Sequence, residues 1–310
     1  MKYKKSFLLI TLLFSFFFIS CKARKVNTSD KINIVCSFFP LYDWTNTIIG
    51  GLENESTLTM LEKSGTDYHY FEPSQIETEL IQNCDILIFN GGESEKWIYD
   101  ILSETQNKSI ITVNCSNILQ NNLIKTETSY DEHLWLSIEN AITCCKEICK
   151  ILCNVIPSNS QKYTDNLNEY IEQLENLDLS FKTAVQNGKT NKILFADRFP
   201  FSYFARDYKL ECYSVIDECT KSKTASEKEI QRMAENLNAF SINCLIILDQ
   251  STKDLARKII LEAKNPHCDI FEMDSLQTSS LRNAFNDKTY IYAMQQNLKT
   301  LSNALNSVNQ

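Results

Sequence analysis

Histidine is scarce in this sequence, with three occurrences in 310 residues: His69, His133 and His267. Neither His69 nor His133 has a second histidine within reach along a helix, which excludes a local zinc site of the HxxxH type. A metal site that used both residues would have to be assembled by the fold from distant segments. For each histidine taken alone, a surface or hydrogen-bonded side chain is the simpler interpretation.

The apolar run from Ser6 to Ser20 falls short of the roughly 20 residues that a membrane-spanning helix needs. It follows a basic start and is typical of an export signal, which we place at residues 1–20. The pair Ser20-Cys21 resembles the bacterial lipoprotein processing site. We therefore expect Cys21 to carry a lipid anchor and residues 21–30 to form a linker; the alternative is an ordinary cleaved signal with an incidental cysteine.

An excess of basic residues is also absent. The chain has 31 Lys and Arg against 39 Asp and Glu, and its formal net charge is −8. Removal of the leader, which carries lysines but no acids, makes the remaining chain more negative. Because nucleic acids select basic surfaces, we expect no nucleic-acid partner.

The chain has twelve cysteines but lacks the CxxC spacing of chelating zinc sites. Several lie in or beside apolar strand-like runs, which predicts buried free thiols rather than a disulfide scaffold. These are Cys36, Cys84, Cys115, Cys244 and Cys268. A second group spans residues 144–153, where Cys145, Cys149 and Cys153 recur every four residues along one helical face. Core packing is the favoured interpretation of this group, and metal binding is the alternative.

From residue 31 the chain alternates strand-like and helix-like segments. Strands that are apolar throughout and separated by helices predict parallel sheets covered on both faces. The predicted strands are residues 31–38, 56–62, 85–92, 109–116, 192–199, 211–217, 242–250 and 268–274. Residues 159–187 form a long polar helix with a narrow apolar stripe, which we expect to bridge two lobes.

The predicted fold is therefore α/β, with two lobes built on mainly parallel sheets and joined by one long helix. The lobes comprise residues 31–156 and 190–310, with the linking helix at 157–189. Open parallel sheets place their sites beyond the carboxyl ends of the strands. His69 and His133 both lie in loops of that kind, just before helices, whereas His267 precedes the last strand and is predicted to be a surface residue.

Six segments follow one another as in a known family. They are "CSFFPLYDWTNTIIG", "GTDYHYFEPS", "NGGESEKWIYDIL", "DEHLWLSIENA", "FADRFPFSYFARDYKL" and "YIYAMQQNLKTLSNAL". In this order they resemble the zinc/manganese solute-binding lipoproteins of bacterial metal ABC importers, the ZnuA-like and TroA-like family, over nearly all of the mature chain. The resemblance implies two pseudo-symmetric α/β lobes joined by a single rigid helix, with one metal ion held between them.

The same resemblance implies the ligands. His69 and His133 match two histidine motifs of the family, whereas Tyr68 and Glu132 stand where the family often has proline, a departure expected to affect loop rigidity rather than the ligands. At the third position the gap-free match is an arginine, which stays protonated and cannot ligate. The third and fourth ligands are therefore predicted to be Asp197 and Asp274, with Glu272 as the fallback for Asp274.

The implied function is capture of a divalent transition metal, with zinc favoured and manganese as the alternative, and its delivery to an ABC permease and its ATPase. The protein is expected to be a lipid-anchored monomer at the cell membrane, facing the periplasm or the cell exterior, and not an enzyme. A surface adhesin is a further alternative. A zinc hydrolase with Glu72 as its base is another, but the "EPS" that contains this residue equally marks the start of a helix.

Overall fold

The computed structural model describes residues 31–51, 55–127, 129–216, 224–281, 286 and 288–308. The predicted signal, the linker and the proposed lipidation residue Cys21 lie outside these residues. Lys31–Gln310 groups as one compact unit. No helix in the part of the chain that the structure describes is long and apolar enough to cross a membrane.

The first half of this unit contains a four-stranded parallel sheet with the strand order β2-β1-β3-β4. Its strands are β1 (Ile32–Cys36), β2 (Ser56–Met60), β3 (Ile86–Phe89) and β4 (Ile111–Asn114). The helices between and after them are α1 (Phe39–Ile49), α2 (Gln75–Asn83), α3 (Lys96–Glu104) and the short α4 (Cys115–Ile118). Every residue of β3 is buried, as expected for a central parallel strand covered by helices on both faces.

The second half repeats this arrangement, with the strand order β6-β5-β7-β8 and parallel pairing throughout. Its strands are β5 (Lys192–Arg198), β6 (Glu211–Ile216), β7 (Cys244–Leu248) and β8 (Asp269–Met273). Its helices include α7 (Ser202–Tyr208), α8 (Glu227–Ala239) and α9 (Asp254–Ala263). Two parallel sheets with the same order confirm the predicted α/β fold class. The exact lobe boundaries stay predictions.

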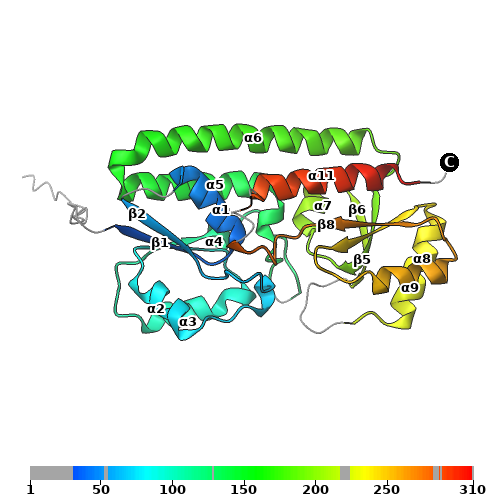
Figure 1. Cartoon of the computed structure of the whole chain (residues 1–310), viewed down its shortest axis with the longest axis horizontal. Helices are drawn as coiled ribbons and strands as arrows, with labels where there is room; N and C mark the ends of the chain where they lie inside the picture. The colour runs from blue at the N-terminus through cyan, green and yellow to red at the C-terminus, as the bar shows by residue number, and fades with distance from the viewer. Residues whose placement is uncertain are drawn as a thin grey trace, which may run out of the picture. The chain divides into compact units, whose positions relative to one another are not determined.

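Three longer helices lie along one side of the two sheets: α5 (Ile138–Val155), α6 (Ser160–Gln186) and α11 (Tyr290–Asn306). Figure 1 shows α6 running above α5 and α11, and it packs on both of them and on α1. Its apolar stripe is buried while the rest of the helix faces water, as its periodicity predicts. The buried residues are Tyr163, Leu167, Tyr170, Leu174, Leu177 and Phe181.

The cysteines of α5 belong to the core. Cys144, Cys145 and Cys149 are buried, and Cys153 is half-buried with its Sγ 3.8 Å from that of Cys149. All ten cysteines in the described ranges are free thiols. Seven of the ten are buried, whereas Cys153, Cys212 and Cys268 are half-buried. The expectation of free thiols instead of a disulfide scaffold therefore holds for all ten, and that of burial fails for Cys268.

Direct hydrogen bonds tie the first half of the unit to the second. The Tyr290 hydroxyl donates to the carbonyl of Trp135 at 2.7 Å, and its backbone N–H donates to Asp43 Oδ2 at 3.0 Å. The indole N–H of Trp135 donates to the carbonyl of Ser275 at 2.8 Å. All of these groups are buried. The loop after β8 and the start of α11 are thus fixed onto α1 and onto the turn that contains Trp135.

The apolar stripe of α6 can be tested with two leucines of that helix. Leu174 is 0% exposed and Leu179 is 62% exposed. We expect Leu174→Ala to lower the free energy of unfolding by about 2–5 kcal/mol, because it leaves a cavity in the core. Leu179→Ala removes the same atoms from the wet face of the same helix and should change stability by less than about 0.5 kcal/mol. Urea unfolding of both variants measures the difference, and equal losses would contradict the packing of α6.

Candidate metal centre

Both predicted histidine ligands lie in loops beyond the carboxyl ends of strands. His69 is the middle residue of a single 3-10 turn, Tyr68–Tyr70, which follows β2, and its backbone N–H donates to Asp67 Oδ1 at 3.0 Å. His133 immediately precedes another such turn, Leu134–Leu136. A carboxylate two residues before each histidine therefore fixes the backbone on which the imidazole is carried, since Asp131 Oδ1 accepts from the His133 N–H at 2.9 Å.

The imidazole rings of His69 and His133 are in direct contact. Nε2 of His69 lies 3.1 Å from Nε2 of His133, and the two residues are only 8% and 5% exposed. An ion bound at the usual distance of about 2.0–2.1 Å from both nitrogens would subtend an N–metal–N angle of roughly 100°. That angle suits a tetrahedral or an octahedral ion. The fold thus brings together two histidines that are far apart in the sequence, in a geometry that a single ion could bridge.

The environment keeps His69 in the neutral form that binds metal. Burial is the largest influence and lowers the pKa of His69 to about 3, and the neighbouring His133 and Arg198 lower it further against the opposing charges of Asp67 and Asp131. Burial alone would raise the pKa of Asp131, but its contacts with His133 outweigh this effect and lower it. A neutral ring offers its lone pair to an ion without first losing a proton.

Asp197, the predicted third ligand, lies near the end of β5 and accepts two backbone N–H bonds, one from β5 and one from β7. Its Oδ1 accepts from Arg198 at 2.8 Å and its Oδ2 accepts from Leu248 at 3.2 Å. The Arg198 guanidinium donates to Asp67 Oδ2 at 2.9 Å. Arg198, the gap-free match to the third ligand position, thus makes an ion pair with Asp67, which caps the turn of His69.

Asp274, the predicted fourth ligand, is half-buried after β8, and its Oδ1 accepts from the Leu276 N–H at 2.7 Å. Burial and then the nearby Asp249 raise the pKa of Asp274 to about 7. Glu272, the fallback, is exposed and pairs with Lys253 at 3.1 Å. Within the described ranges, no group of three or more His, Cys, Asp or Glu side chains is close enough to hold one ion. The four-residue ligand set stays a prediction, and the structure brings together its two histidines.

The two departures from the family's proline have specific contacts. Tyr68 donates its backbone N–H to the carbonyl of Gln277 at 2.9 Å, a bond that a proline cannot make. Glu132 is buried, and its Oε2 lies 3.7 Å from Nδ1 of His69. The expectation that Glu132 affects only loop rigidity is therefore wrong. The sequence signal was a charged residue at a position where the motif often has proline, but its contact with His69 could not be seen without the fold.

A family model described as zinc-uptake complex component A, periplasmic, matches residues 34–304. The chain belongs to this family. Among its curated relatives, zinc-binding protein AdcA of Streptococcus pyogenes serotype M6 is 27% identical over an alignment of 322 positions, gaps included, which covers 96% of this chain and 61% of that protein. The chain thus spans about three fifths of the length of AdcA. The zinc-uptake component A family comprises binding components and not enzymes, which removes the hydrolase alternative.

Two further comparisons bear on this member of the zinc-uptake component A family. An iron ABC transporter substrate-binding lipoprotein, MtsA of the same S. pyogenes serotype, is 26% identical over 255 residues, covering 79% of this chain and 81% of MtsA. The solved structure of the periplasmic zinc-binding protein TroA of Treponema pallidum aligns with a TM-score of 0.76 and 19% identity, over 89% of this chain and all of that one. At this identity the likeness shows the fold alone.

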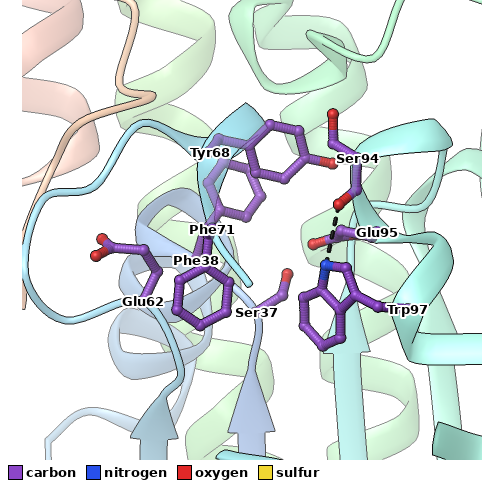
Figure 2. A pocket seen from close by; sticks show the side chains of 8 residues that line it. All are labelled: Ser37, Phe38, Glu62, Tyr68, Phe71, Ser94, Glu95 and Trp97. Atoms are coloured by element: carbon purple, nitrogen blue, oxygen red, sulfur yellow. Dashed lines mark hydrogen bonds between the residues drawn. The ribbon is translucent and has the colours of Figure 1, made fainter. Parts of the chain in front are cut away.

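A small cavity lies beside the turn of His69 in this zinc-uptake component. Figure 2 shows the Ser37 side chain between the rings of Phe38 and Trp97, with the Glu95 carboxyl close by. Its volume of about 10 Å³ leaves room for roughly one water molecule. The cavity is therefore too small for an organic ligand.

Glu95 makes folding sensitive to pH. Burial raises its pKa from 4.5 to about 8, so the folded chain keeps a proton that the unfolded chain has already lost. Its contribution to the free energy of unfolding therefore falls as the pH rises from about 4.5 to 8. Glu95→Gln keeps the shape without the acid, so it should raise the Tm over that of wild type by more at pH 8 than at pH 5. Thermal unfolding at both pH values checks this, and the same Tm difference at both would refute it.

Proposed function

We propose that this chain is the extracytoplasmic binding component of a metal ABC importer, which captures one divalent transition metal ion and delivers it to a permease and its ATPase. One observation carries the proposal: two buried imidazoles, His69 and His133, face each other with their Nε2 atoms 3.1 Å apart. Their position beyond the carboxyl ends of parallel strands is where open α/β folds bind ligands. Membership of the zinc-uptake component A family supports the same assignment.

Zinc is the proposed cargo. Neutral imidazole nitrogens suit borderline ions such as zinc, whereas manganese prefers carboxylate and carbonyl oxygens. The family description and the AdcA relative both name zinc, although MtsA names iron. Manganese remains the alternative cargo within the same function, and it would require the carboxylates of the second half to take part.

The proposed location is the outer face of the cell membrane, in the periplasm or at the cell exterior, with Cys21 as the lipid attachment point of a monomer. The apolar leader that ends at Cys21 supports this, and so does the description of MtsA as a substrate-binding lipoprotein of an ABC transporter.

The histidine pair can be tested by single substitutions, with a third histidine as the matched control. His69→Ala and His133→Ala each remove one of two nitrogen ligands, so each should weaken zinc binding by more than about 100-fold. His267 is exposed and lies before β8, so His267→Ala should bind zinc as wild type does. Competition with a chromophoric zinc chelator gives the affinities. Wild-type affinity in either of the first two variants would remove that histidine from the site.

The proposed carboxylate ligands call for a separate test, since both already bond to backbone N–H groups. If Asp197 and Asp274 complete the coordination, Asp197→Asn and Asp274→Asn should bind zinc more weakly and show a smaller zinc-dependent rise in Tm, which follows the affinity by mass action. Asp274→Asn keeps the one acceptor that its backbone bond needs, so its metal-free Tm should change little. Asp197→Asn keeps only one of two acceptors, so its metal-free Tm should fall, and its zinc-dependent rise is measured from that lower value. A full zinc-dependent rise in both variants would assign the remaining ligands elsewhere, with Glu272 tested first.

A further inference from the structure

Two adjacent carboxylates lie behind the histidine pair, on the side away from the ion-binding nitrogens. Asp131 Oδ1 accepts from Nδ1 of His133 at 2.6 Å. Glu132 Oε2 lies 3.7 Å from Nδ1 of His69. Consecutive residues of one loop thus place one carboxylate behind each of the two imidazoles. A carboxylate such as Asp131 is a usual hydrogen-bond partner of a metal-bound histidine. Glu132 instead occupies a position where the family motif often has proline.

Ser94 connects Glu132 to His69. Oγ of Ser94 lies 2.9 Å from Nδ1 of His69, and the backbone N–H of Ser94 donates to Glu132 Oε1 at 2.9 Å. When Nε2 of a histidine binds an ion, the ring proton is held on Nδ1 and needs an acceptor. The Ser94 hydroxyl is placed to accept it, and Glu132 holds the backbone that carries this hydroxyl.

The residues around Glu132 leave space for its carboxylate and hold its backbone in place. Gly92 has a φ of +110°, and a Cβ at this position would come within 2.5 Å of Glu132 Oε1. At the other end of the residue, the Asn90 side-chain amide donates to the Glu132 carbonyl at 2.8 Å. A glycine thus makes room for this carboxylate, and the backbone that carries it is fixed. With 8% exposure, the residue has little freedom to turn toward solvent.

We propose that Glu132 is a positioning residue of the metal site, which orients His69 through Ser94 and, together with Asp131, balances the charge of a divalent ion. The proposal rests on the metal-binding function proposed above. Two neutral imidazoles bring no negative charge, and Arg198 adds a positive one near His69. A buried divalent ion is costly without compensating charge nearby. The Asp131 and Glu132 carboxylates supply that charge from the first half of the unit alone.

The experiment compares zinc binding in the full-length chain and three variants at pH 7. Glu132→Gln keeps the size and the acceptor for Ser94 but removes the charge, and it should weaken zinc binding by about 10–100-fold. Glu132→Asp keeps the charge and should recover a large part of that loss. Glu95→Gln is the matched control, because it changes another buried glutamate whose pKa of about 8 leaves it mostly protonated at this pH. It should bind zinc as wild type does.

A second measurement separates positioning from general stability. In the zinc-loaded protein, the ¹⁵N chemical shift of His69 Nδ1 should move in Glu132→Gln, because the hydrogen bond made by that nitrogen changes, while the metal-free Tm stays close to that of wild type. Wild-type zinc affinity in Glu132→Gln would overturn the inference and leave the proposed function intact. Equal losses of affinity in the Gln and Asp variants, with an unmoved ¹⁵N shift, would also overturn it. Failure of the wild-type chain itself to bind zinc would instead refute the function.

Discussion

The close approach of two imidazoles is the interaction on which the rest of this site depends. His69 and His133 come from loops after different strands, and they can face each other at 3.1 Å only if at least one ring is uncharged. Burial provides that condition by lowering the pKa of His69 to about 3. The same burial would make an isolated ion expensive to bind. Every other feature of the site either holds the two rings in place or supplies charge around them.

The second half of the unit holds the two histidine loops in position. Arg198 pairs with Asp67, whose other oxygen caps the turn of His69. The Tyr203 hydroxyl donates to the carbonyl of Asp131 at 2.8 Å, on the loop that carries His133. Any movement of the second half relative to the first would therefore pull on both histidine loops. Under the function proposed above, this connection would couple ion binding to the relative position of the two halves.

The fold was largely predictable because its signals are local. Eight strands, the long helix and the buried face of α6 all follow from apolar patterning, which needs no knowledge of distant contacts. The histidine pair also followed, from its position after strands and from the family resemblance. What the sequence could not show is where a side chain points after folding. The sequence argument only excludes the arginine at the third ligand position, Arg198, as a ligand, yet Arg198 pairs with Asp67. It treats Glu132 as a residue that affects loop rigidity, yet Glu132 lies behind His69.

The choice of metal follows from the same geometry. Both nitrogens already face one point, so an ion that accepts imidazole gains two ligands with little rearrangement. The carboxylates of the second half are in a different position: Asp197 already accepts two backbone N–H bonds and Asp274 accepts one. Those bonds orient the two carboxylates, and each oxygen keeps a further lone pair with which it could bind an ion. An oxygen-preferring ion such as manganese would depend on these carboxylates more than zinc does, whereas the imidazole pair alone suits zinc.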